Sequence, residues 1–126
     1  MKKIVKFNDL SSIVKKLKKN KNTVVLCHGV FDLLHVGHIK HLNKAKELGD
    51  KLIVTITADK YVNKGPGKPV FNQELRAEAL SSIECVDYVS INESTNAVIP
   101  LSIVKPDIYF KGRDYKNSKD DISGQI

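Results

Sequence analysis

The junction between a strand-like run and a helix-like stretch constrains this chain more than any other feature. Residues 23–27, Thr-Val-Val-Leu-Cys, form an apolar run rich in β-branched residues, as in a buried strand. Residues 29–38, Gly-Val-Phe-Asp-Leu-Leu-His-Val-Gly-His, come next, and the apolar residues of 39–48 recur at helical spacing. Because the first turn of a helix presents unpaired N–H groups and the positive end of its dipole, this junction suits a phosphate group.

Two histidines flank a glycine at this junction. His35 and His38 supply hydrogen-bond donors that can be neutral or cationic near pH 7, and Gly37 lets a ligand approach the backbone closely. A lone histidine near a helix start is usually a solvated polar residue. Two of them in an H-x-G-H arrangement after a buried-looking strand indicate a functional site.

Strand-like and helix-like patterns alternate along the rest of the chain. We expect Asp9 or Ser11 to cap the first helix and Asn72 to cap the third. The alternation predicts an α/β fold in which one Rossmann-like, doubly wound parallel sheet forms a single domain. Ligands of such sheets bind at the carboxyl ends of the strands. The predicted helices are 9–19, 36–49, 72–82 and 95–104, and the predicted strands are 23–28, 52–57, 86–91 and 107–111.

The net charge of +7 comes from one element. Residues 1–21 hold eight lysines and one acid, whereas the other 105 residues hold 13 basic and 13 acidic side chains. The first helix has no aromatic residue, so we expect a solvated lysine face rather than a nucleic-acid or membrane surface. The predicted core stripes are Leu10, Ile13, Val14 and Leu17 in the first helix and Ile39, Leu42, Ala45 and Leu48 in the second.

The cysteines, the remaining histidines and the N-terminus favour a cytoplasmic protein without a structural metal. No apolar run reaches the roughly 18 residues of a membrane span, and the N-terminus lacks the apolar stretch of a signal peptide. Cys27 and Cys85 are isolated, so reduced thiols are expected. The four histidines and two cysteines show no zinc spacing, and His28 and His41, which lie outside the motif, receive no role.

Residues 29–38 resemble the signature of the cytidylyltransferase-like nucleotidyltransferases, a superfamily that shares its H-x-G-H element with class I aminoacyl-tRNA synthetases. Residues 45–50, Ala-Lys-Glu-Leu-Gly-Asp, and 110–115, Phe-Lys-Gly-Arg-Asp-Tyr, extend the resemblance over about 23–115. The chain looks similar to glycerol-3-phosphate cytidylyltransferase and to the heptose 1-phosphate adenylyltransferase domain. The segment 110–115 favours the second of these.

The resemblance implies transfer of AMP or CMP from ATP or CTP to a phosphorylated sugar or polyol, with release of pyrophosphate. Because the nucleophile is an anionic phosphate, catalysis needs no general base and rests on positioning and charge stabilisation. By resemblance, His35 and His38 are the catalytic residues that contact the phosphates, and Mg²⁺ arrives with the triphosphate. The residues expected to line the nucleotide with backbone groups are Gly29, Val30, Phe31 and Gly37.

A Gly- and Pro-rich loop, 59–71, carries two lysines that the resemblance places on the phosphates. Lys64 is expected to be catalytic and Lys68 to bind the nucleotide, and the alternative for each is an ordinary solvated lysine. Arg76, in the next helix, either reaches the nucleotide or pairs with Glu74 or Asp87.

Two further segments complete the predicted nucleotide site. Asp32 either caps the helix that follows it or contacts the metal ion. At the end of the last predicted strand, Lys111 and Gly112 are expected to shape the base pocket and Asp114 to accept hydrogen bonds from the ligand; the alternative is a polar turn.

The resemblance also bears on domain organisation. The family pattern continues with a strand and a Ser/Thr-rich helix start, so we expect 1–126 to be a nucleotidyltransferase domain that lacks its C-terminal strand and helix, within a longer chain. A fused sugar kinase, as in some relatives, would fit. The expected partners are ATP or CTP, a small phosphorylated acceptor and a second copy in a homodimer. A nucleotide-binding module without turnover is the alternative function.

Overall fold

One parallel sheet forms the centre of the molecule. The structure, a computed structural model, describes residues 2–62 and 68–111. The strands are β1 (Val24–Gly29), β2 (Lys51–Thr57), β3 (Tyr88–Asn92) and β4 (Ile108–Tyr109), and they lie in the order β3-β2-β1-β4. All pairings are parallel, which confirms the Rossmann-like, doubly wound arrangement. The order reverses between β1 and β4, and a crevice at such a switch point is where these sheets bind ligands.

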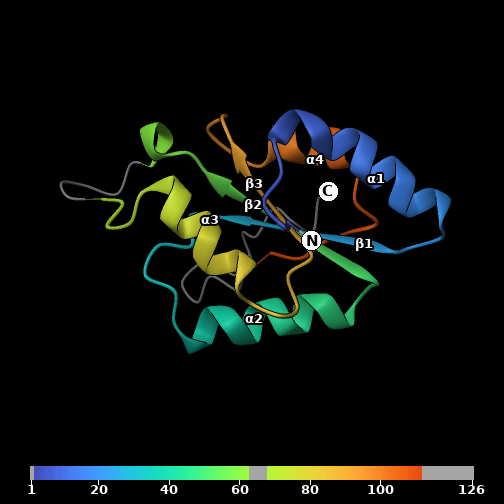
Figure 1. Cartoon of the computed structure of the whole chain (residues 1–126), viewed down its shortest axis with the longest axis horizontal. Coiled ribbons are helices and arrows are strands. Elements are labelled where there is room, and N and C mark those ends of the chain that lie inside the picture. The colour runs from blue at the N-terminus through green and yellow to red at the C-terminus, as the bar shows by residue number, and fades with distance from the viewer. Residues whose placement is uncertain (1, 63–67, 112–126) are drawn as a thin grey trace.

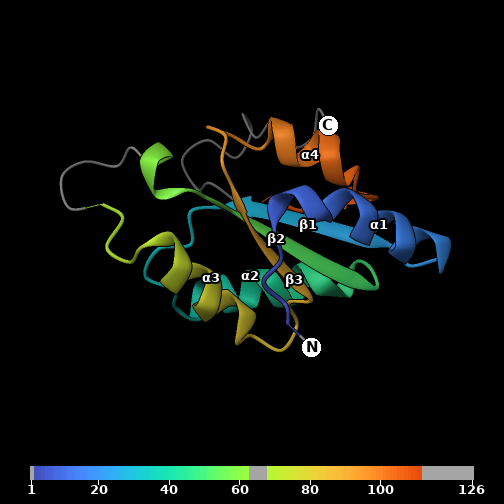
Figure 2. The same ribbon diagram turned by 45° about the horizontal axis from the view of Figure 1, so that its top comes forward.

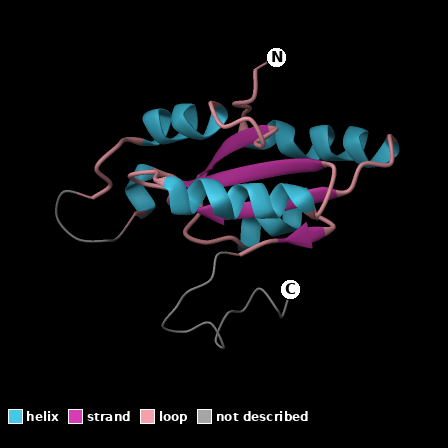
Figure 3. Cartoon of the chain, turned by 90° about the horizontal axis from the view of Figure 1, so that it is seen from below, coloured by secondary structure: helices cyan, strands magenta, loops and turns pink. Residues whose placement is uncertain are grey.

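Helices cover both faces of the sheet (Figure 1). The helices α1 (Leu10–Lys19) and α4 (Val98–Val104) lie on one face, and α2 (Val36–Glu47) and α3 (Gln73–Ser81) lie on the other. Figure 3 shows the strands side by side with helices lying along them. Two short 3-10 turns, η1 (Phe7–Asp9) and η2 (Asp59–Tyr61), precede α1 and follow β2.

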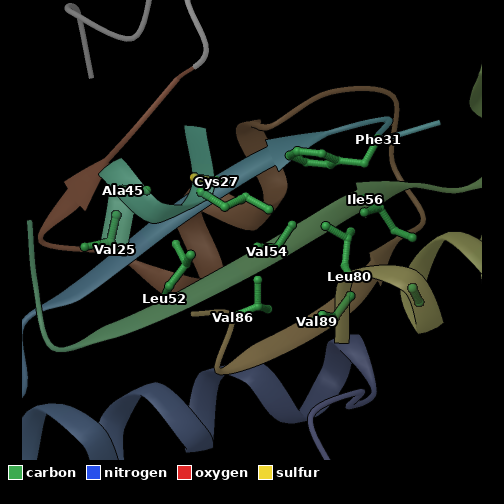
Figure 4. Packing of buried hydrophobic residues seen from close by; sticks show 12 residues of the cluster. Val25, Cys27, Phe31, Ala45, Leu52, Val54, Ile56, Leu80, Val86 and Val89 are labelled. Atoms are coloured by element: carbon green, nitrogen blue, oxygen red, sulfur yellow. The ribbon is translucent and has the colours of Figure 1, made fainter. Parts of the chain in front are cut away.

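Alternate strand residues supply two separate cores. Val25 and Cys27 of β1 belong to the cluster on the side of α2 and α3, which also contains Ala45 and Leu80 (Figure 4). Val24 and Leu26 point to the opposite face. On that face the buried side chains of α1 are Leu10, Val14 and Leu17, with Ile13 partly buried beside them, as the sequence predicts. The N-terminal segment runs along β3, where Ile4 bridges to Val89 (Figure 2).

The structure corrects the expected cap of α1 and part of the expected buried stripe of α2. Asp9 is the N-cap of α1 by position, but its side chain makes no capping hydrogen bond, and Ser11 lies inside the helix. In α2, Leu42 and Ala45 are fully buried, whereas Ile39 is 38% exposed and Leu48, which caps a helix that ends at Glu47, is 46% exposed. The stripe of α2 that faces the sheet is therefore narrower than the apolar pattern indicates.

Helix α4 begins three residues later than predicted. The buried Asn92 explains this, because its Oδ1 accepts hydrogen bonds from the Ser94 N–H and hydroxyl, and its Nδ2 donates to the Asn96 carbonyl at 2.8 Å. These bonds hold the backbone after β3 in a turn and delay α4 to Val98. The cap of α3 is confirmed, since Asn72 Oδ1 accepts from Leu75 N–H at 2.8 Å.

Candidate functional site

The two motif histidines form the first turn of α2. His35 is the N-cap, in an extended conformation, and its Nδ1 accepts a hydrogen bond from Gly37 N–H at 2.9 Å. The Nδ1 of His38 accepts in turn from the His35 N–H at 3.2 Å. The two rings lie 4.3 Å apart, centroid to centroid. Each imidazole thus satisfies a backbone donor that a helix N-terminus otherwise leaves unpaired.

This bonding fixes which nitrogen of each ring carries the proton. A ring nitrogen that accepts a hydrogen bond is unprotonated, so each neutral imidazole has its proton on Nε2. Burial lowers the pKa of His38 and the neighbouring His35 lowers it further, which keeps His38 neutral near pH 7. Two Nε2–H donors are therefore available, side by side, at the positive end of the helix dipole.

Gly37 and Phe31 fix these rings from two sides. A Cβ on Gly37 would lie 2.6 Å from Cε1 of His35, so the glycine leaves room for the imidazole. Gly37 therefore has a role in seating the His35 ring, in addition to the close approach of a ligand that the sequence predicts. The Phe31 ring is buried in the core beneath α2 and meets His38 edge-on, with centroids 5.9 Å apart.

Asp32 does not cap the helix that follows it, and its contact with a metal ion stays a prediction. The cap of α2 is His35, and both Asp32 carboxylate oxygens accept backbone hydrogen bonds, from Val70 N–H at 2.6 Å and Phe71 N–H at 3.0 Å. Burial alone raises the pKa of Asp32, but these bonds and the charges of Arg76 and Lys68 outweigh it and lower the pKa below its usual value. Asp32 therefore connects the turn at residues 30–34 to residues 70 and 71, which precede α3.

Arg76 pairs with neither Glu74 nor Asp87, the partners considered from the sequence. It is 1% exposed, and its Nη2 forms an ion pair with Asp59 Oδ1 at 2.6 Å. Asp87 pairs with Lys46 instead, at 2.6 Å.

The other Arg76 nitrogens donate to backbone carbonyls. Nη1 donates to Val30 at 2.9 Å and to Thr57 at 2.8 Å, and Nε donates to Phe71 at 3.0 Å. The Val30 carbonyl, expected to line the nucleotide, therefore bonds to protein.

The remaining predicted site residues lie around the same edge of the sheet. Gly29 ends β1, directly before the motif turn. Lys68 is exposed and lies near enough to Asp32 to lower its pKa. Lys111 follows β4, next to β1 at the switch point, and is half-buried. Lys64, Gly112 and Asp114 lie outside the described residues.

Sequence reasoning missed Asp59 and gave His28 and His41 no role. Asp59 lies two residues beyond the end of β2, at the predicted binding edge, and that position was a usable signal for a partner of Arg76. Helix α2 also carries His41, whose ring stacks on Phe110 at 4.7 Å.

His28 lies between two threonines of β2. Its Nδ1 is 2.8 Å from Thr55 Oγ1 and its Nε2 is 3.4 Å from Thr57 Oγ1. Burial lowers the pKa of His28 to about 4. These hydrogen bonds, which join β1 to β2, explain why a histidine occupies position 28.

The described ranges, 2–62 and 68–111, contain no group of three or more His, Cys, Asp or Glu side chains arranged to hold a metal ion. Asp32, the carboxylate next to the histidines, uses both oxygens on backbone N–H groups. Phosphate oxygens of a bound triphosphate would supply several of the ligands of a magnesium ion at this site. Within the same ranges, no helix is long and apolar enough to cross a membrane.

Comparisons with known proteins agree with this arrangement. Bifunctional protein HldE of Nitratiruptor sp. is 46% identical over 115 residues, which are 90% of this chain and 25% of that protein. Bifunctional protein HldE of Helicobacter pylori strain G27 is 41% identical over 87% of this chain and 24% of its own length. The chain thus spans about a quarter of the length of these curated relatives.

A solved structure shares the fold. The lipopolysaccharide core biosynthesis protein of Thermoplasma volcanium superposes with a TM-score of 0.72 and 31% identity, over 83% of this chain and 86% of that one. The model of the cytidylyltransferase-like family matches residues 26–123, which include the whole histidine motif and the strands β2, β3 and β4. The chain belongs to the cytidylyltransferase-like family.

Proposed function

We propose that this domain transfers a nucleotidyl group from a nucleoside triphosphate to the phosphate of a phosphorylated sugar, with release of pyrophosphate. The observation that carries the proposal is the pair of Nε2–H donors that His35 and His38 present at the N-terminus of α2. Neutral donors at the positive end of a helix dipole suit a phosphate whose charge grows during reaction.

The proposed chemistry follows from these groups. An oxygen of the acceptor phosphate attacks the α-phosphorus, the bond to the bridging oxygen of the β-phosphate breaks, and pyrophosphate leaves with that electron pair. The attacking oxygen is already anionic, so no side chain has to remove a proton. His35 and His38 donate hydrogen bonds to the α-phosphate oxygens, and Lys68 contributes positive charge. Bound magnesium would neutralise charge on the triphosphate.

ATP is the proposed donor and a sugar phosphate the proposed acceptor. Residues 110–115 resemble the heptose 1-phosphate adenylyltransferase rather than the cytidylyltransferase. The similarity to the HldE proteins and to the lipopolysaccharide core biosynthesis protein supports a phosphorylated sugar of the lipopolysaccharide core as the acceptor. CTP remains the other candidate donor.

Pyrophosphate release, measured with ATP or CTP and a panel of sugar and polyol phosphates, tests the proposal. We expect activity that needs both substrates and falls about 100-fold or more in His35→Ala and in His38→Ala, corresponding to about 3 kcal/mol of transition-state stabilisation. Lys40→Ala, an exposed change on the same helix, is the control and should leave the rate unchanged. Nucleotide binding without product for every acceptor would instead identify a binding module.

A further inference from the structure

The turn that leads to the histidines has a strained backbone. Phe31 and Leu33 adopt positive φ values of 54° and 52°, on either side of Asp32. Bulky residues without the freedom of glycine rarely occupy this left-handed region, and they persist there only when surrounding contacts hold them. Leu33 is 47% exposed, so packing of its own side chain does not hold this turn.

Asp32 and Arg76 supply the contacts that hold it. Asp32 fixes the centre of the turn by accepting from the Val70 and Phe71 N–H groups. Arg76 fixes the start of the turn, because its Nη1 donates to the Val30 carbonyl. Its Nε donates to the carbonyl of Phe71, the residue whose N–H is bound to Asp32. Residue Phe71 is thus held at its N–H by Asp32 and at its carbonyl by Arg76.

We infer that Asp32 and Arg76 are positioning residues, which hold the strained turn 30–34 in the shape that presents the imidazoles of His35 and His38, and which do not themselves contact the nucleotide. Both Asp32 oxygens and all three Arg76 nitrogens have protein partners, and Arg76 is fully buried. This inference rests on the proposed function, which it deepens.

The separation of kcat from KM distinguishes positioning from direct contact. In Asp32→Asn the amide replaces one acceptor with a donor that faces a backbone N–H, so the turn loses one of its two bonds. We expect kcat to fall about 10- to 100-fold, because a small displacement of catalytic groups is that costly. KM for the triphosphate and the magnesium concentration for half-maximal activity should change less than about threefold, since ground-state contacts remain.

Imidazole nitrogen signals in two-dimensional ¹H–¹⁵N NMR spectra supply a readout that needs no turnover. In the wild-type chain the His35 and His38 signals should report protonated Nε2 and unprotonated Nδ1. In Asp32→Asn we expect mixed tautomers for His35. Unchanged imidazole signals would overturn the inference whatever the rate, and so would a tenfold rise in the magnesium requirement, which would indicate metal contact.

Arg76→Lys is the second variant. Lysine keeps the positive charge beside Asp59 but cannot span the Val30, Thr57 and Phe71 carbonyls, so we expect the same fall in kcat and the same NMR change. Glu74→Gln, an exposed charge removal on the same helix, is the matched control and should resemble wild type. If the wild-type chain forms no product with any substrate pair, the proposed function fails, while the NMR comparison still decides the positioning role.

Discussion

At the scale of single residues, the His35 ring explains why position 37 is glycine. In Gly37→Ala the new Cβ would meet the ring at 2.6 Å, so the ring must rotate and lose its bond from residue 37 N–H. Lost capping costs about 1 kcal/mol, and the gain from replacing glycine in a helix is of similar size. We therefore expect a melting temperature close to that of wild type but a kcat reduced at least about tenfold.

Thermal denaturation and initial rates, measured on the same Gly37→Ala preparation, check this prediction. Lys40→Ala again serves as the control, because it changes an exposed residue of the same helix. A variant with full kcat would contradict the assignment of His35 as a donor that depends on its cap geometry.

His28 makes a prediction about pH. Burial lowers its pKa from 6.5 to about 4, so between these values the unfolded chain binds a proton that the folded chain does not. Above about pH 6.5 His28 is neutral in both states and its titration does not affect the free energy of unfolding. As the pH drops toward 4, the unfolded chain gains the proton first, and the free energy of unfolding falls by about 3 kcal/mol in total. In His28→Gln, the free energy of unfolding in urea should lose less on acidification than in wild type.

The comparison at pH 8 is the internal control for His28→Gln, since histidine is neutral there in both states. The difference between the two proteins at pH 8 measures the bonds to Thr55 and Thr57, and its change toward pH 4.5 measures the proton. Parallel curves for the two proteins would show that His28 titrates normally.

At the scale of elements, the caps of two helices predict opposite outcomes. Asn72→Ala removes the bond to Leu75 N–H and should lower the free energy of unfolding by about 1 kcal/mol. Asp9→Ala removes a side chain that makes no capping bond, so a change within about 0.5 kcal/mol is expected. Urea denaturation of both variants checks the pair, and an equal loss for the two would contradict the cap assignments.

The same scale shows how far the sequence predicts this protein. The four α-helices and four strands of the described residues were all predicted, because an apolar period of 3.6 residues and runs of β-branched residues reflect burial directly. The side-chain cap of α1 and the start of α4 were misjudged, because the side chains of Asp9 and Asn92 have several possible backbone partners and tertiary contacts select among them.

Site prediction had the same limit. The histidines follow from a local pattern, since a cap and its helix are neighbours in sequence. The partners of Asp32 lie 38 and 39 residues away, and Arg76 bonds to Val30 across 46 residues. Periodic patterns in a sequence do not reveal pairings between such distant residues. Asp32 and Arg76 were therefore predicted as site residues, but their hydrogen-bond partners were not.

At the scale of the whole molecule, the lysines that give the chain its excess positive charge lie outside the packed core. The buried stripe of α1 lies against the sheet, and the lysines of the same helix stay outside, as at Lys15, Lys16 and Lys19. Because the charges of residues 22–126 balance, we expect affinity for a triphosphate to come from local groups at the edge of β1 and α2 rather than from overall charge.

Ligand-linked stability therefore tests both the site and the choice of nucleotide. A ligand at 100 times its dissociation constant stabilises the folded state by about 2.7 kcal/mol, which for a chain of this size raises the melting temperature by roughly 8–12 °C. We expect magnesium ATP to produce this shift, CTP a smaller one, and Lys68→Ala to reduce the ATP shift without changing the melting temperature of the free protein, because Lys68 is exposed. A larger shift with CTP would reverse the proposed donor, and no shift with either nucleotide would remove the nucleotide site from the carboxyl edge of this sheet.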